Sequence, residues 1–160
     1  MRVPVKAKIL STVAAVLMIG VILVALPLTI PKLFGIQIYN LLTPSMEPAM
    51  PVGSAVYVAS CSPEELVPGE IIAYEPGENS DVVQTHRIVK NETPLQQLIT
   101  KGDANAETDA APVPYDRVVG KVVFSVPILG TLSQALHSVG GITVCIAIFA
   151  MAFILWTLAD

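Results

Sequence analysis

Two long apolar segments frame a middle region in which hydrophobic and polar residues alternate over short distances. Ile9 to Ile30 contains no charged residue, and neither does Ile142 to Leu158. A helix needs about 20 apolar residues to cross a bilayer, so the first segment is long enough and the second is near the lower limit. The pattern therefore predicts two transmembrane helices, one towards each end of the chain.

Each apolar segment also has a second interpretation. A basic head before an apolar run is typical of a cleaved signal peptide, but the apolar part of such peptides spans only about 7–15 residues. Pro27 lies near the end of the first run, and Pro31 and Lys32 follow it, without a convincing small-residue cleavage site. We therefore expect an uncleaved anchor. The second run could be a buried core helix, although Trp156 lies where aromatic residues mark a membrane interface.

Basic residues around the first segment predict its orientation. Arg2, Lys6 and Lys8 precede it, whereas only Lys32 follows closely. Because basic residues accumulate on the cytoplasmic side, we expect the N-terminus in the cytoplasm and the middle region outside the cell or in a secretory lumen. A second span would return the chain to the cytoplasm. The expected localisation is the cell membrane, as a multi-pass protein, or the endoplasmic reticulum membrane if the source is eukaryotic.

The middle region has the pattern of a small β-rich domain. Short runs rich in β-branched residues alternate with turn residues such as Pro68-Gly69 and Lys101-Gly102-Asp103. The fold class that follows is mainly β, a compact antiparallel sheet flanked by an N-terminal and a C-terminal transmembrane helix. The predicted strands are Ser54 to Val58, Glu70 to Tyr74, Val82 to Lys90 and Val118 to Val126.

Three regions follow from these patterns. Residues 1–33 form a cytoplasmic N-terminus and anchor, 34–126 the β-rich domain, and 127–160 a membrane-approach segment and the second helix. We expect Gly140-Gly141 to break the chain between the approach segment and that helix.

Composition and charge narrow the function classes. The mean hydropathy is +0.67 and only 14% of residues are charged, against about 25% in soluble proteins. The net charge is −4 and no basic patch is visible, which argues against nucleic acid as a partner. Cys61 lies in a polar loop and Cys145 in an apolar run, so a disulfide or a metal site has little support.

A proline-framed serine lies soon after the first apolar segment. Ser45 stands between Pro44 and Pro48, which disfavour both a helix and a central strand and leave a stiff, extended or turned segment. A serine hydroxyl is a weak nucleophile unless a neighbouring base takes its proton. Ser45 is therefore a candidate nucleophile if other residues supply that base.

The chain has two histidines that could act as such a base. His137 lies in the apolar approach to the second span, whereas His86 lies in the predicted strand from Val82 to Lys90. Strand alternation places Gln84 and Ile88 on the same face as His86. Taken alone, the pattern favours an ordinary half-exposed strand residue at His86.

A polar loop from Thr100 to Asp109 supplies three carboxylates, Asp103, Glu107 and Asp109. The loop could simply be solvated, with its Asp and Asn residues serving turn geometry. A calcium loop is a poor match, because the sixth position lacks glycine and Pro114 stands where a bidentate Glu belongs. The remaining interpretation makes one aspartate the partner of His86.

Taken in order, these segments resemble the motifs of type I signal peptidases of the serine–histidine subtype, found in archaea, the endoplasmic reticulum and some Gram-positive bacteria. In this subtype a histidine replaces the lysine base of most bacterial members. The resemblance covers about four-fifths of the chain. The matching segments are Thr43-Pro44-Ser45-Met46-Glu47-Pro48, Pro68 to Tyr74, Thr85-His86-Arg87-Ile88-Val89 and Lys101 to Asp109.

The resemblance implies a role for each matched residue. By its place in the motifs, Ser45 resembles the nucleophile of the family and His86 resembles its general base. Two aspartates occur in the last motif: Asp109 is our choice to orient His86, and Asp103 would be structural or auxiliary. The Ser45 N–H would be one oxyanion donor and the Thr43 hydroxyl a second.

One departure and one alternative concern the chemistry. Pro44 replaces the glycine common before the serine, which stiffens the nucleophile segment. A lysine base, Lys90 or Lys101, is conceivable but would have to lose its proton through burial or its neighbours.

The function that the resemblance implies is removal of signal peptides from exported preproteins. A membrane-bound serine endopeptidase would cleave after small residues through an acyl-enzyme on Ser45, without a metal or organic cofactor. Its partners would be preproteins, the lipid bilayer and the secretion translocon. Two alternatives stay open: a processing peptidase dedicated to a few substrates, such as pilins or matrix proteins, and a membrane module without catalysis.

Overall fold

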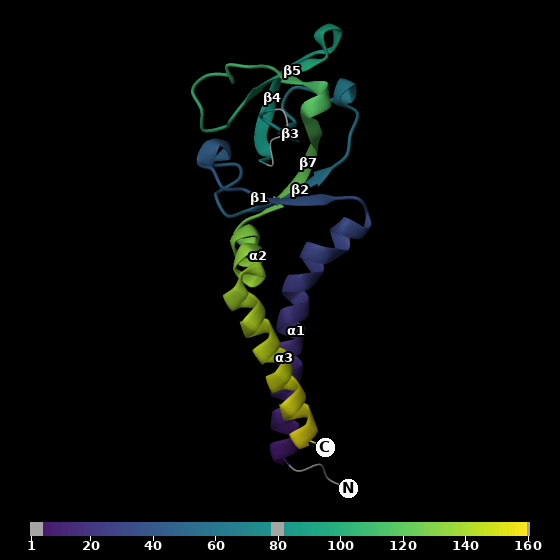
Figure 1. Ribbon diagram of the computed structural model, residues 1–160, viewed down its shortest axis with the longest axis vertical. Coiled ribbons are helices and arrows are strands. Elements are labelled where there is room, and N and C mark those ends of the chain that lie inside the picture. The colour runs from purple at the N-terminus through teal and green to yellow at the C-terminus, as the bar shows by residue number, and fades with distance from the viewer. Residues whose placement is uncertain (1–4, 78–81, 160) are drawn as a thin grey trace. The chain divides into compact units, whose positions relative to one another are not determined.

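The computed structural model describes residues 5–77 and 82–159. Arg2 of the predicted basic head lies outside the described residues. The described chain divides into two units: a helical one containing residues up to Ile30 and from Ser133 onward, and a β-rich one from Pro31 to Leu132. In chain order, the helices and strands are α1 (Val5–Leu33), β1 (Gln37–Asn40), β2 (Ala55–Ala59), β3 (Ile71–Tyr74), β4 (Gln84–Glu92), β5 (Gln97–Lys101), β6 (Val113–Pro114), β7 (Val118–Val126), α2 (Leu129–His137) and α3 (Val139–Ala159) (Figure 1).

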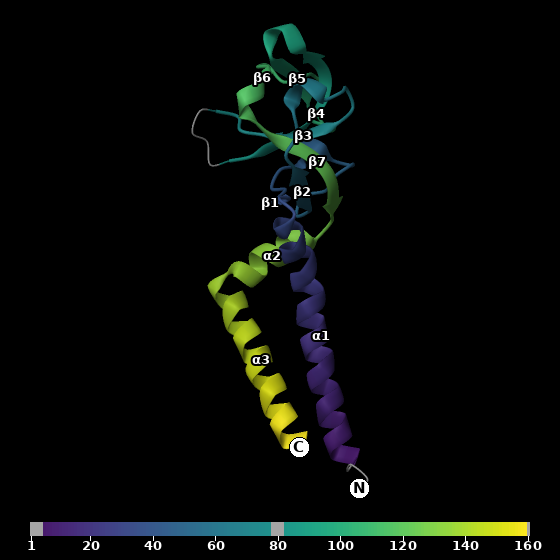
Figure 2. The ribbon, with the colours of Figure 1, turned by 90° about the vertical axis from the view of Figure 1, so that its right-hand side faces the viewer.

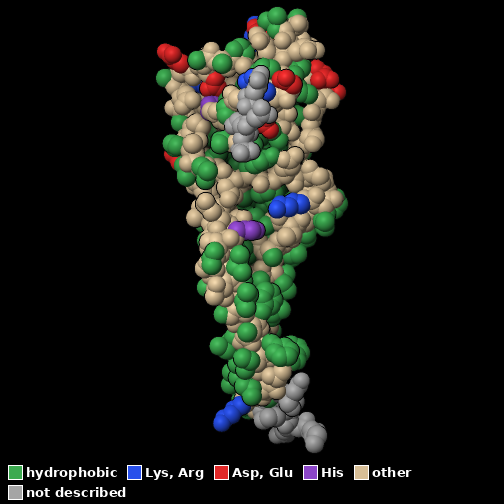
Figure 3. Space-filling model, viewed as in Figure 1, with side chains coloured by type: hydrophobic (Ala, Val, Ile, Leu, Met, Phe, Trp, Pro, Cys, Tyr) green, Lys and Arg blue, Asp and Glu red, His purple; other side chains and the backbone are tan. Residues whose placement is uncertain are grey.

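Two of these helices are long and apolar enough to cross a membrane, Val5–Leu33 and Val139–Leu158. Apolar side chains cover the surface along both helices, whereas most of the visible acidic side chains lie over the strands (Figure 3). Within the helical unit, Ala7, Ala14, Leu28 and Ala152 are buried, whereas most of the large apolar side chains are exposed. A helix that is apolar on all sides suits a lipid environment. The fold prediction of two flanking apolar helices is confirmed.

The predicted position of the chain break before the last helix is wrong. Gly140 and Gly141 lie inside the first turn of α3, and the break falls at Ser138. The Ser138 side chain accepts a hydrogen bond from the Gly141 N–H at 3.1 Å, as an N-cap residue does. A Cβ on Gly141 would lie 2.0 Å from the Ala135 carbonyl oxygen, so this glycine allows close approach of the two helices.

The β-rich unit contains one antiparallel sheet of seven strands, in the order β1-β2-β7-β3-β4-β5-β6 (Figure 2). The mainly β, antiparallel prediction is therefore confirmed. The four predicted strands exist with ends within two residues of the prediction. Strands β1, β5 and β6 were not predicted, because they are short and polar residues interrupt their apolar pattern.

Alternation along β3 gives the sheet a buried cluster on each face. Ala73 packs in one cluster, whereas Ile72 and Tyr74 pack in the other. The first cluster contains Leu41, Met46, Met50, Val56, Val58 and Ala73. The second contains Leu66, Ile72, Tyr74, Ile88, Leu98 and Val113. The first cluster includes the residue after Ser45, and the second lies on the face that carries His86.

Candidate functional site

Ser45 lies in a short 3-10 turn, Pro44–Met46, between β1 and β2. Thr43 has an extended backbone and Pro44 starts the turn, as the two prolines of this segment predicted. The next residue, Met46, is completely buried in the first apolar cluster, while Ser45 is half-buried. Burial of Met46 therefore anchors the turn and leaves the serine at the surface.

The loop from Thr100 to Asp109 contacts the backbone of Ser45. The Ala104 N–H donates to the Ser45 carbonyl oxygen at 2.9 Å. A Cβ on Gly102 would lie 2.6 Å from the same oxygen, so this close approach requires glycine. Two segments far apart in sequence thus meet at the candidate nucleophile. The Ser45 Oγ lies 3.3 Å from the Thr43 Oγ1, its hydrogen-bond partner here.

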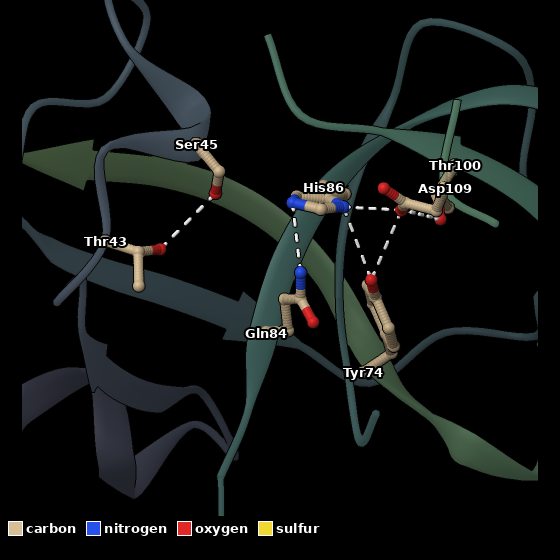
Figure 4. Close-up of polar contacts among 7 residues, drawn as sticks. All are labelled: Thr43, Ser45, Tyr74, Gln84, His86, Thr100 and Asp109. Carbon is tan, nitrogen blue, oxygen red and sulfur yellow. Dashed lines mark hydrogen bonds and ion pairs between the residues drawn. The ribbon is translucent and has the colours of Figure 1, made fainter. Parts of the chain in front are cut away.

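His86 lies in β4 opposite Ile72 of β3 and is 2% exposed. Its Nδ1 is 2.5 Å from the Asp109 Oδ2. Asp109 is itself held by Thr100, whose Oγ1 donates to Oδ2 at 2.6 Å and whose carbonyl oxygen accepts the Asp109 N–H at 2.8 Å. The histidine therefore has a fixed carboxylate partner on its Nδ1 side (Figure 4).

Tyr74 joins this pair from β3. Its hydroxyl lies 3.3 Å from the His86 Nδ1 and donates to the Asp109 Oδ2 at 3.4 Å. Burial, together with the nearby Asp109 charge, raises the pKa of Tyr74. The phenol therefore stays protonated at neutral pH and remains a hydrogen-bond donor to the carboxylate.

Gln84 occupies the other side of the imidazole ring. Its Nε2 lies 3.1 Å from the His86 Nε2, and this contact agrees with the predicted shared strand face. Ser45 also lies on the Nε2 side of the ring, opposite Asp109 (Figure 4). The candidate base thus faces the candidate nucleophile with the nitrogen that a serine mechanism uses.

Asp103 is placed away from His86. It accepts two hydrogen bonds from Arg87, at 2.7 and 2.6 Å, and Arg87 also donates to the Gly69 carbonyl oxygen at 2.6 Å. The bond to Asp103 raises the pKa of Arg87. The structure therefore brings Asp109, and not Asp103, to the imidazole, while Asp103 fastens the loop to β4.

The two lysines considered as alternative bases have other partners. Lys90 is exposed and pairs with Glu92 at 2.6 Å, and Lys101 donates to the Ala106 carbonyl oxygen at 3.1 Å. His137 is exposed on α2, where its Nδ1 contacts the Ser133 carbonyl oxygen.

Tyr74, Gln84 and Thr100 were not among the predicted site residues. A signal for Gln84 was present, because strand alternation already placed it on the face of His86. Tyr74 and Thr100 reach the site only through the pairing of β3 and β5 with β4, which the sequence does not reveal.

A groove of about 540 Å³ has mainly apolar side chains in its wall. Thr43 and Gln84, which contact Ser45 and His86, also line it. Among residues 5–77 and 82–159, no group of three His, Cys, Asp or Glu side chains has the arrangement of a metal site. The candidate site brings together a hydroxyl, an imidazole and a carboxylate, and Thr43 and Gln84 connect it to the apolar groove.

Comparison with known proteins gives one curated relative, and no family model matches the chain. The relative is signal peptidase I W of Bacillus subtilis strain 168, which is 37% identical over 91 residues, or 55% of this chain and 47% of the relative. The chain thus matches about half the length of this relative. The resemblance to type I signal peptidases that the motifs indicated is confirmed by this similarity.

Proposed function

We propose that the chain is a membrane-bound serine endopeptidase of the signal peptidase I type, which removes signal peptides from exported preproteins. The observation that carries the proposal is the 2.5 Å contact between the His86 Nδ1 and the Asp109 Oδ2, with Ser45 on the Nε2 side of the ring (Figure 4). Similarity to a protein named signal peptidase I W supports the reaction class.

In the proposed mechanism the Ser45 Oγ attacks the carbonyl carbon of the scissile peptide bond. The His86 Nε2 takes the hydroxyl proton and then gives it to the leaving amine, which leaves an ester on Ser45. Water attacks this ester with the same histidine as the base, which regenerates the hydroxyl. Asp109 keeps the ring oriented and stabilises the imidazolium that forms between these proton transfers.

Two hydrogen-bond donors would stabilise the oxyanion of the tetrahedral intermediate. The Ser45 N–H is one, and the Thr43 hydroxyl, 3.3 Å from the Ser45 Oγ, is the other. Thr43 is exposed and lies in the wall of the groove, so a bound substrate carbonyl can reach it. The side-chain hydroxyl would then turn from Ser45 to the developing negative charge.

The groove supplies a place for the substrate segment before the cleavage site. Its wall includes Leu42, Val56 and Val83, which suits short apolar side chains better than charged ones. Cleavage after a small residue, with another small residue two positions earlier, is the specificity that the family resemblance implies.

Membrane attachment through α1 and α3 suits such a substrate. A signal peptide has an apolar core that stays in the bilayer, and anchoring the peptidase in the same membrane raises the effective concentration of both partners. We propose that the N-terminus is cytoplasmic, that the β-rich unit faces the outside or a secretory lumen, and that preproteins arrive from the translocon.

The decisive test is cleavage of a signal-peptide-bearing preprotein by the full chain in liposomes, comparing wild type with Ser45→Ala. The matched control is Ser62→Ala, because Ser62 is exposed in the same unit and its side chain makes no capping hydrogen bond. We expect cleavage by wild type and Ser62→Ala, and a loss of at least about 10⁴-fold in Ser45→Ala. Equal cleavage by all three proteins would remove Ser45 as the nucleophile.

A further inference from the structure

The two nitrogens of the buried His86 ring have chemically different partners. On one side, the Nδ1 lies 2.5 Å from a carboxylate oxygen of Asp109 and 3.3 Å from the Tyr74 hydroxyl. On the other, the Nε2 lies 3.1 Å from the amide nitrogen of Gln84. Since the ring is 2% exposed, these side chains decide which nitrogen carries the proton (Figure 4).

The partners select one tautomer of the neutral ring. An ionised carboxylate only accepts hydrogen bonds, so the Nδ1 must donate to Asp109. A neutral ring then leaves the Nε2 as an acceptor, and the amide N–H of Gln84 can donate to it. This arrangement satisfies both nitrogens inside the protein, which a buried polar group requires.

We propose that Gln84 is a positioning residue that fixes His86 as the neutral Nδ1–H tautomer and occupies its Nε2 until substrate binds. The inference deepens the proposed function and rests on it, because the Nε2 is the atom that would take the Ser45 proton. In the free protein, Ser45 is paired with Thr43 and His86 with Gln84. Nucleophile and base are therefore each held by a neighbour.

The position of Gln84 explains how substrate would release it. Gln84 is half-buried at the start of β4, opposite Tyr74 of β3, and two residues from His86 on the same strand face. It lines the groove that Thr43 also lines. A peptide in this groove would contact Gln84 and Thr43 together, so binding would free the Nε2 and the Ser45 hydroxyl at the same time.

Other titratable groups near the ring must be considered for any pH effect. Asp109 and Tyr74 face the Nδ1. Glu75 and Arg117 line a second pocket of about 230 Å³, which Gln84 and Asp109 also border. Substitutions of Gln84 leave these four groups in place, so a change in the His86 titration reports on the side chain at position 84.

Two substitutions of Gln84 both remove the hydrogen-bond donor at the His86 Nε2, but only one of them puts a negative charge in its place. Gln84→Glu places a carboxylate where the amide donor was, which favours an N–H at this nitrogen and the charged imidazolium. The midpoint of the His86 titration should rise by about one pH unit or more. Gln84→Met keeps the length of the side chain but removes the donor, so the Nε2–H tautomer should increase with a smaller change of midpoint.

The experiment is ¹⁵N NMR of the imidazole in the full chain in detergent, in a His137→Gln background and without a histidine tag. The chain has two histidines, so the remaining imidazole signals come from His86 alone. The matched control is Gln37→Glu, because Gln37 is exposed on β1, and β2, β7 and β3 separate that strand from β4 in the sheet. Gln37→Glu should leave the tautomer and midpoint unchanged.

A second readout is the pH profile of kcat/KM. Below the raised midpoint, the kcat/KM of Gln84→Glu should be lower than that of wild type by about tenfold for each pH unit of the shift. It should recover as the pH increases. A wild-type ring with its proton on the Nε2, or Gln84 variants with unchanged tautomer and midpoint, would overturn the inference. The NMR result does not depend on cleavage, so failure of the proposed function in the Ser45→Ala test remains a separate outcome.

Discussion

The segment that carries Ser45 and the strand that carries His86 differ in how firmly their side chains are held. His86 is buried and contacts three polar side chains, Asp109, Tyr74 and Gln84. The Ser45 hydroxyl is half-exposed, and its polar contact within residues 5–77 and 82–159 is to the Thr43 hydroxyl, at 3.3 Å. The side chain of His86 is thus held by its neighbours in the sheet, whereas Ser45 is held mainly through its backbone and the burial of Met46.

This difference separates two kinds of contribution to activity. Side chains around His86 act by orienting a buried ring, so their loss should change both chemistry and packing. On the Ser45 side, Thr43 is exposed, so loss of its hydroxyl should change the rate while the protein stays equally stable. The two aspartates of one loop provide the sharpest comparison, because only one of them contacts the ring.

Among substitutions of the side chains around His86, the largest effect is expected from Asp109→Asn. An asparagine fits the same space but can present an N–H to the Nδ1, which favours the wrong ring tautomer, and kcat should fall by about 10³-fold or more. Asp103→Asn is the matched variant and should lower kcat less than about tenfold. It should instead reduce the free energy of unfolding by about 1–3 kcal/mol, because its paired hydrogen bonds to Arg87 are weakened.

Both variants are measured as full-length protein, by preprotein cleavage and by chemical denaturation in detergent. The assignment of Asp109 would be wrong if Asp103→Asn lost the greater part of kcat while Asp109→Asn kept it. An equal loss of stability in both variants would mean that the hydrogen bonds between Asp103 and Arg87 add no stability beyond what the Asp109 contacts provide.

A smaller effect on rate is expected on the nucleophile side. Thr43→Val removes the hydroxyl but keeps the size of the side chain, and removal of one oxyanion donor typically costs about 10²-fold in kcat. Thr43 is exposed, so the free energy of unfolding should not change. Thr43→Ser restores a hydroxyl and should recover most of the rate. Full activity in Thr43→Val would exclude the hydroxyl from the reaction.

The apolar helices and the main strands could be predicted because their signals lie in consecutive residues. Hydropathy alone located Ile9 to Ile30 inside α1, and the β-branched run from Val118 to Val126 matches β7 residue for residue. Ser138 shows the limit of such patterns. A glycine pair was the stronger sequence signal for a helix break, but the side-chain cap and the close helix approach decided the position.

The candidate site was predictable only where a motif marks it. Ser45, His86 and Asp109 could be selected from the ordered segments that resemble a family, and their roles stay a prediction until variants are measured. Thr100 and Tyr74 could not be selected, because they act through strand pairing. Thr100 lies opposite Ile88 and Tyr74 opposite Gln84, and such registers depend on the whole sheet.

The smallest expected effect concerns Tyr74 and the stability of the His86 side at alkaline pH. Burial and the Asp109 charge raise the pKa of Tyr74 above the ordinary value of 10.0. As the pH rises past 10, the unfolded chain therefore loses this proton before the folded protein does. The folded state then binds more protons, so stability is fully present below about pH 10 and falls above it, by at most about 1.4 kcal/mol per pH unit.

Tyr74→Phe keeps the ring beside His86 and removes the titrating hydroxyl, so its unfolding free energy should fall less between pH 10 and 11 than that of wild type. Tyr39→Phe is the comparison, because Tyr39 is less buried and its removal should change this slope less. Both are measured by chemical denaturation of the full chain in detergent. An unchanged slope in Tyr74→Phe would mean that the phenol gives up its proton as easily as in the unfolded chain, and the His86 side would then be less enclosed than its contacts indicate.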